Sequence, residues 1–168
     1  MVFFENLYFG CMLITYTIFI TFLYHKHAEN PSISKTIEQN REPILLMVFV
    51  FFIFTILYES HRYRKFSIFA SIILLYIGIF GVILINEDNI GHYIFATLVG
   101  LSMLIFIFLH CLIKKENSVD RYWLLFYLTI IAIIGCLINM DTNITYWEAL
   151  FISLFAIFYI SLHFQDTI

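Results

Sequence analysis

The sequence predicts an all-α, polytopic membrane protein, folded as a bundle of six transmembrane helices. Of its 168 residues, 62% are hydrophobic and 12% are charged, and the mean hydropathy is +0.92. The apolar residues form runs of roughly 20, the length that crosses about 30 Å of hydrocarbon. Because a backbone in lipid has to satisfy its own hydrogen bonds, each run is expected to be a helix. These spans use almost the whole chain, which leaves one domain and no separate soluble module.

The six expected spans follow one another with short connections, apart from one long loop at residues 25–42. The first run begins after Glu5 without a basic residue, so it lacks the positive start of a signal peptide and is expected to be a retained span. Pro43 opens the second run at a helix-start position, where its missing N–H costs nothing. A tight acidic turn with Glu87 and Asp88 joins the third and fourth runs. The expected spans cover residues 6–24, 43–61, 66–86, 91–113, 122–140 and 146–164.

Basic residues are unevenly distributed among the loops. Three lie within residues 62–65, after the second span, and three lie within residues 114–121, after the fourth, whereas the loops after the third and fifth spans have none. The positive-inside rule therefore predicts that both termini are in the cytoplasm or its equivalent. The long first loop also carries three basic residues, on the other side, and partly opposes this assignment.

Composition limits the classes of function. With nine Lys and Arg and a net charge of −3, the chain has no basic field for nucleic acid. Its three cysteines lie in apolar runs, so no disulfide framework is readable. The sequence offers no Ser-His-Asp arrangement, no hydrolase-type His/Asp set and no phosphate loop. We therefore expect no catalytic residues and no cofactor, although an enzyme acting on lipid stays the least favoured alternative.

A layer of histidines is expected at the cytoplasmic ends of the spans, formed by His61, His110 and His163 together with Glu59. Three histidines at one depth can ligate a metal or a haem. A histidine at a helix C-terminus also interacts favourably with the last carbonyls and the helix dipole. The spacing lacks the local pairs of a metal motif, so we favour the second interpretation and predict no metal.

The opposite edge offers a candidate polar site of His92, Glu148 and Asp88, which would contact a ligand or a lipid head group. Glu148 has a structural alternative, because Thr145 and Glu148 fit the Ser/Thr-x-x-Glu capping box of a helix start. Asn89 is likewise a plausible cap for the fourth helix, three residues before His92. A shared site requires the fourth and sixth spans to be neighbours with the two side chains turned toward each other.

Small residues flank the acidic turn at helix-packing spacing. Gly78 and Gly81 precede the turn, and Ala96 and Gly100 follow it one helical turn apart. In lipid, small residues let two helices approach closely and gain dispersion contact. The third and fourth spans are therefore expected to pack tightly through these four positions.

Several stretches of the chain resemble the six-span damage-regulated autophagy modulator (DRAM) group and its prokaryotic relatives. The matching stretches are HRYRK at 61–65, YIGIFGVILI at 76–85, HYIFA at 92–96 and YWEALFISLF at 146–155. Members of that group also tend to open the fourth span with a His and the sixth with a Glu, as His92 and Glu148 do here. The resemblance implies a six-helix bundle with cytoplasmic termini that works in lipid handling, trafficking or regulation of a partner. It carries over no catalytic residue.

The chain departs from the DRAM group in two places. Its first loop lacks the cysteines of many animal members, and Ala149 stands where the group has an aromatic residue. The leading prediction is a non-enzymatic membrane factor that binds membrane lipids or a membrane partner. The alternative is a small subunit of a larger membrane complex such as a respiratory assembly, favoured by the small size, the Phe-rich composition and a passing likeness of residues 76–85 to a complex I span.

Overall fold

A computed structural model describes residues 2–26, 32–62, 66–113, 119–139 and 144–165 of the chain. Within these ranges the chain forms seven helices and no strand, which confirms the all-α class. The helices are Val2–Lys26 (α1), Ile33–Gln39 (α2), Arg41–Arg62 (α3), Phe66–Leu84 (α4), Ile90–Ile113 (α5), Val119–Ile138 (α6) and Ile144–Gln165 (α7).

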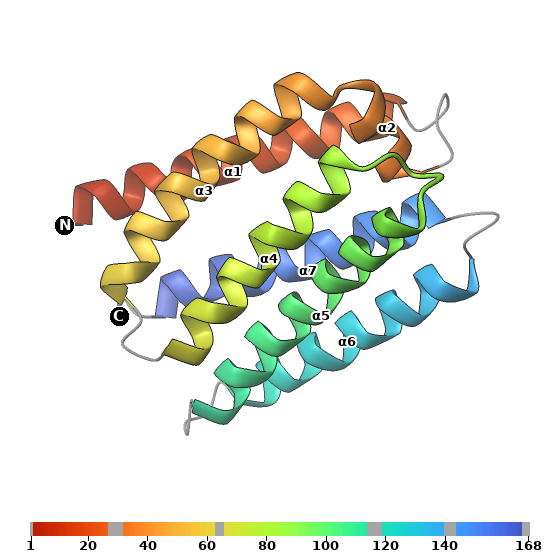
Figure 1. Cartoon of the computed structure of the whole chain (residues 1–168). Helices are drawn as coiled ribbons and strands as arrows, with labels where there is room; N and C mark the ends of the chain where they lie inside the picture. Colours follow the sequence, from red (N-terminus) through yellow and green to blue (C-terminus); the bar gives the residue numbers. More distant parts are fainter. Residues whose placement is uncertain (1, 27–31, 63–65, 114–118, 140–143, 166–168) are drawn as a thin grey trace.

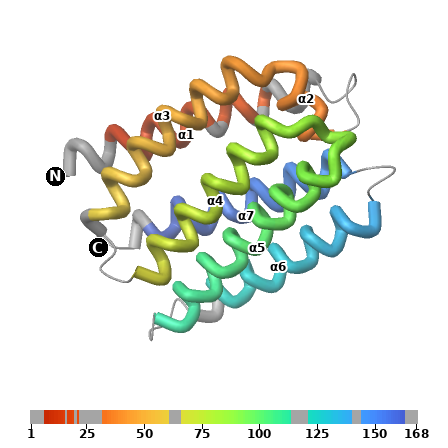
Figure 2. The backbone as a smooth tube through the Cα atoms, in the orientation of Figure 1, coloured from red at the N-terminus to blue at the C-terminus, as the bar shows by residue number. Residues whose placement is uncertain are grey.

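The long helices lie side by side and alternate in direction along the chain (Figures 1 and 2). Helix α1 begins and α7 ends at the same end of the bundle, which we call the termini end. Helix α2 and the turn at residues 85–89 lie at the opposite end, which we call the α2 end. Each of these two ends therefore brings together segments from distant parts of the sequence.

Among the described residues, five helices are long and apolar enough to cross a membrane. They are α3 over Arg41–Ser60, α4 over Phe66–Leu84, α5 over Ile90–Ile113, α6 over Arg121–Ile138 and α7 over Ile144–Leu162. These helices identify the chain as an integral, multi-pass membrane protein. The apolar part of α1, Leu7–Phe19, is shorter than the others, so its passage through the membrane stays a prediction.

The long loop expected at residues 25–42 contains a helix, α2, that was not predicted. Helix α2 begins after Ser32, whose side chain accepts a 2.9 Å hydrogen bond from the backbone N–H of Lys35, an ordinary N-cap. Asn40 ends α2, and its carbonyl accepts a 3.3 Å bond from Ile44 N–H, so α3 starts directly afterwards, before Pro43. Because α2 has only seven residues and no long apolar repeat, the hydrophobic pattern of the sequence does not predict it.

The core is aromatic at the termini end. The side chains of Phe106, Tyr122 and Phe158 are almost entirely buried there, and they come from α5, α6 and α7. The ring of Phe158 meets Tyr122 edge-on at a centroid distance of 5.1 Å and Phe106 at 6.1 Å. A second cluster, with Leu75, Met103, Ala132, Phe151 and Leu154, joins α4, α5, α6 and α7 farther along the bundle.

Helices α4 and α5 approach closely at Gly78 and Gly81, both of which are buried. A Cβ atom on Gly78 would lie 2.8 Å from Val99 Cγ2 and 3.0 Å from its backbone nitrogen, and one on Gly81 would overlap the Phe95 ring. The two glycines therefore make room for α5, as their spacing predicts.

The expected contribution of Ala96 and Gly100 to this contact is wrong. Ala96 is exposed, and a Cβ on Gly100 would lie 3.8 Å from Ile133 and 4.0 Å from Phe151, on α6 and α7. The reason is helical rotation, because neighbouring residues on a helix differ by about 100° in direction. Phe95 and Val99 fill the groove on α4, so the residues after them point elsewhere.

The α6–α7 pair repeats the arrangement of the α4–α5 pair. Gly135, near the end of α6, faces the ring of Trp147 in the first turns of α7, and a Cβ on Gly135 would overlap that ring. The chain before each turn reads Leu-Ile-Asn, at residues 84–86 and 137–139. Both pairs thus place an aromatic ring of the second helix on a glycine in the last turn of the first.

Candidate functional site

The α2 end is held together by carboxylates from other helices. The backbone N–H of Ile33, in the first turn of α2, donates a 2.8 Å hydrogen bond to Glu148 Oε2 on α7. The side chain of Ser34 also hydrogen-bonds to Glu148. One residue earlier, Ser32 Oγ donates a 2.5 Å bond to Glu87 Oε1 in the turn between α4 and α5. Two carboxylates thus bind the start of one short helix, where free backbone N–H groups favour negative charge.

The other end of α2 is tied to the same turn. Arg41 Nη2 donates a 2.5 Å hydrogen bond to Asn86 Oδ1. Lys35 Nζ lies 3.1 Å from Glu38 Oε2, and this hydrogen bond is the main reason why the pKa of Lys35 is raised and that of Glu38 lowered. The Glu38 carboxylate also accepts a hydrogen bond from the backbone of Glu87. Helix α2 is therefore fixed across the end of the bundle by bonds to α7 and to the turn after α4.

The capping-box interpretation of Glu148 is wrong. Helix α7 begins at Ile144, so Thr145 lies inside the helix and not at the N-cap position that the motif requires. The carboxylate of Glu148 caps α2 instead, a helix 115 residues earlier in the chain. The sequence did not predict this bond, because it did not predict α2, the helix that Glu148 caps.

His92 sits in the first turn of α5, after the predicted N-cap Asn89. The cap is confirmed, since Asn89 Oδ1 accepts a 2.8 Å bond from the backbone N–H of Gly91. The His92 side chain is 2% exposed, and its Nδ1 lies 3.0 Å from the carbonyl oxygen of Ile85. A carbonyl can only accept, so Nδ1 carries a hydrogen, and Nε2 is an acceptor whenever the ring carries only that one hydrogen. Within the described part of the chain, His92 Nε2 is buried and has no hydrogen-bonding partner.

The three residues predicted for one polar site all lie at the α2 end, but they have separate surroundings. Glu148 binds α2, His92 binds the carbonyl of Ile85, and Asp88 is exposed. Among the described residues no hydrogen bond joins His92 to either carboxylate. The shared site of His92, Glu148 and Asp88 therefore stays a proposal.

At the termini end the structure places Glu59 inside the bundle and not at the expected membrane interface. Its side chain is 0% exposed and accepts a hydrogen bond from the Tyr159 hydroxyl of α7. Further hydroxyls continue from there: Tyr159 to Tyr8 of α1 at 3.3 Å, Tyr8 to Thr55 of α3 at 2.9 Å, and Thr55 to Tyr76 of α4 at 2.7 Å. The sequence contained one signal for this cluster, because Thr55 and Glu59 are four residues apart and share a face of α3.

Of the three histidines predicted to form a layer, His110 is the one whose side chain the structure describes. Its side chain is buried, and Nδ1 lies 2.8 Å from the carbonyl oxygen of Phe106 one turn earlier on the same helix. The side chains of His61 and His163 lie outside the described residues. Among the described residues, no group of three His, Cys, Asp or Glu side chains is placed to hold a metal ion.

Comparison of the chain with models of protein families, with curated proteins and with solved structures gives no match. Inferences about function therefore rest on the geometry of the two polar ends.

Proposed function

We propose that this protein is a non-enzymatic membrane factor that binds, at its α2 end, a lipid head group or a membrane partner. The observation that carries the proposal is the buried Nε2 of His92, an acceptor without a partner in the described residues. A buried acceptor left unpaired costs about 1–3 kcal/mol, so a ligand that donates to it gains affinity. The α2 end lies where the membrane-length helices stop, so on this proposal it is at the depth of lipid head groups.

The chemistry of this end favours a particular class of head group. On this proposal the His92 ring carries its one hydrogen on Nδ1, so Nε2 is an acceptor and the ligand supplies an N–H or O–H donor. Glu87 and the exposed Asp88 lie in the adjoining turn, and their negative charge favours a cationic donor. A primary ammonium group, as in phosphatidylethanolamine, meets both conditions, whereas the trimethylated choline head group has no N–H to donate.

Two further features support the proposal. The resemblance of the sequence to the DRAM group implies lipid handling and cytoplasmic termini. The placement of both chain ends at one end of the bundle fits an even number of crossings, with α1 as the sixth span (Figure 1). On this proposal the termini end faces the cytoplasm, and the α2 end faces the other side of the membrane.

Lipid analysis of the purified protein tests this function. The wild-type chain, extracted in mild detergent, is expected to carry ethanolamine lipid that mass spectrometry detects. His92→Asn keeps a donor toward the Ile85 carbonyl but removes Nε2, so it is expected to stay folded and to lose most of this lipid. Thr97→Ser, on the exposed face of the same helix, is the matched control. Equal lipid content in wild type and His92→Asn would overturn the proposal.

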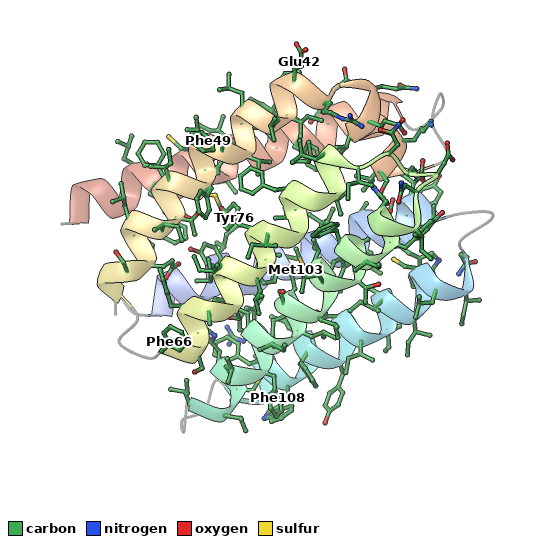
Figure 3. The ribbon with its side chains drawn as sticks, in the orientation of Figure 1. Glu42, Phe49, Phe66, Tyr76, Met103 and Phe108 are labelled. Carbon is green, nitrogen blue, oxygen red and sulfur yellow. The ribbon has the colours of Figure 1, made fainter. Side chains whose placement is uncertain are left out.

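Helix α3 favours a second candidate, a subunit of a larger membrane complex. Only 11% of the membrane-length part of α3 is buried inside the protein, compared with 39% for α4. Large apolar side chains such as Leu46, Phe49 and Phe54 are exposed along it, with Phe49 pointing away from the bundle (Figure 3). Native mass spectrometry separates the two candidates, since a stable multi-subunit particle supports the complex and a lone chain with bound lipid supports the membrane factor.

A further inference from the structure

A chain of hydroxyl groups leads through the bundle to the buried carboxylate of Glu59. It consists of Tyr76, Thr55, Tyr8 and Tyr159, which come from α4, α3, α1 and α7. Tyr76–Thr55, Thr55–Tyr8 and Tyr8–Tyr159 are separated by 2.7, 2.9 and 3.3 Å, and a further hydrogen bond joins Tyr159 to Glu59. These hydrogen bonds thus connect four helices, α1, α3, α4 and α7.

Counting hydrogens fixes the direction of this chain when Glu59 is ionised. A carboxylate only accepts, so Tyr159 has to give its single hydrogen to Glu59 and accept from Tyr8. Tyr8 has then used its own hydrogen and accepts from Thr55, which in turn accepts from Tyr76. All four hydroxyls therefore point their hydrogens toward the negative charge, an alignment in which each bond strengthens the next.

The chain begins in the middle of the membrane and ends near its edge. Tyr76 is the eleventh of the 19 residues of α4 and lies between α3 and α4 (Figure 3). Glu59 lies in the last turn of α3, and the next residue, Ser60, is exposed. Glu59 is therefore adjacent in sequence to a residue exposed at the termini end, whereas the far end of the hydroxyl chain, at Tyr76, lies half-way along α4.

We infer that Glu59 is a proton-binding site, at which the hydroxyl chain stabilises the ionised carboxylate and a proton replaces that stabilisation on acidification. A fully buried carboxylate is costly as a bare ion, so it either receives donors or takes up a proton. Tyr159 suits both protonation states of Glu59, because its hydroxyl donates to the ionised carboxylate and accepts from the protonated carboxyl group. Proton uptake releases the aligned hydrogens, including that of Tyr8, through which α1 is bonded to α3 and α7.

The other titratable groups around the cluster, among the described residues, are Tyr58 on α3, His110 and Cys111 on α5 and Tyr122 on α6, in addition to the tyrosines of the hydroxyl chain. Tyr58 stacks on Tyr8 at a centroid distance of 4.9 Å, and His110 packs on Phe158. Infrared spectroscopy separates a carboxyl group from an imidazole, a thiol and a phenol, so a pH-dependent carbonyl band reports on a carboxyl group and not on these neighbours.

The site is tested by infrared titration of the protein in lipid vesicles. On acidification the wild type is expected to gain the carbonyl band of a buried protonated carboxyl group, and Glu59→Gln is expected to lose this change. Glu42→Gln, at the exposed opposite end of the same helix, is expected to keep it. A pH-dependent band that persists in Glu59→Gln, or its absence from the wild type, would overturn the inference.

Two variants keep the test decisive if Glu59→Gln does not fold. Tyr159→Phe removes the donor to the ionised carboxylate, so the midpoint of the band is expected to rise by about one to two pH units. Tyr76→Phe removes only the far donor and is expected to shift the midpoint less, in the same direction. The exposed Tyr127→Phe serves as control and is expected to cause no shift. An unchanged midpoint in Tyr159→Phe would contradict a role for the chain.

Discussion

The backbone N–H of Ile33 donates a 2.8 Å hydrogen bond to the carboxylate of Glu148, 115 residues later in the chain. This bond joins the first turn of α2 to the second turn of α7. The bond explains why an acidic residue, Glu148, lies near the start of a membrane-spanning helix. Its carboxylate accepts from the backbone N–H of Ile33, which would otherwise be buried and unpaired. The position of α2 over the end of the bundle thus depends on a residue of the last helix.

Loss of this carboxylate is expected to loosen α2. Glu148→Ala leaves the buried Ile33 N–H unpaired, so the free energy of unfolding should fall by about 1–3 kcal/mol. Glu148→Gln keeps an acceptor oxygen and should cost less. Hydrogen exchange in residues 33–39 should accelerate most in Glu148→Ala, with the exposed Glu42→Ala as control. Unchanged exchange in Glu148→Ala would show that the bond does not hold α2.

Substitution of the glycines is expected to separate positions that the sequence treats alike. Gly81→Ala and Gly135→Ala force a methyl group into the Phe95 and Trp147 rings, an overpacking that should cost about 1–3 kcal/mol. Gly100→Ala meets no atom closer than 3.8 Å and removes a flexible residue from a helix interior, so it should be neutral or stabilising by up to about 1 kcal/mol. Thermal unfolding in detergent measures all three. A Gly100→Ala variant as unstable as Gly81→Ala would contradict this assignment.

The sequence predicted the parts of the fold that depend on long apolar runs. The length of the apolar runs predicts the helix class and the extent of α3 to α7 within a few residues. The spacing of small residues predicts the close approach at Gly78 and Gly81. Helix α2 could not be predicted in this way, because it is short and its stability comes from bonds to Glu87 and Glu148. The packing of Trp147 on Gly135 could not be predicted either, because it depends on the rotation of α7 about its axis.

The two polar ends were predictable to different degrees. Their general location follows from the positions of ionisable residues at the ends of apolar runs. The partners within each end depend on how the helices turn about their axes, which charge patterns along one chain do not specify. Glu59 is the clearest example, because its place near the end of a span suggests an interface, whereas the rotation of α3 directs it toward Tyr159 on α7.

The orientation of the bundle gives a third prediction. The basic loops at residues 62–65 and 114–121 predict that the termini end is cytoplasmic. Ser60→Cys, exposed at that end, should react with an impermeant thiol reagent only after the membrane is permeabilised. Asp88→Cys, exposed in the turn at the α2 end, should react in intact cells. Both variants are compared in a background without the native cysteines, and the opposite labelling pattern would reverse the orientation.

The final prediction concerns whether His92 and Glu148 act as one site. Their hydrogen bonds go to different elements, so in lipid-free detergent the stability effects of His92→Asn and Glu148→Ala should add within about 0.5 kcal/mol in the double variant. A lipid head group that reaches His92 at the α2 end would link them, because loosening α2 changes access to the bound ligand.

In the presence of ethanolamine lipid we therefore expect a coupling between the two substitutions that is absent without it. A double-mutant cycle of lipid retention, measured by mass spectrometry beside the stability cycle, gives both quantities from the same four proteins. Additive effects on lipid retention would assign Glu148 to the attachment of α2 alone and would leave His92 as the only candidate contact. Coupling already in lipid-free detergent would instead mean that the two side chains interact through the protein itself.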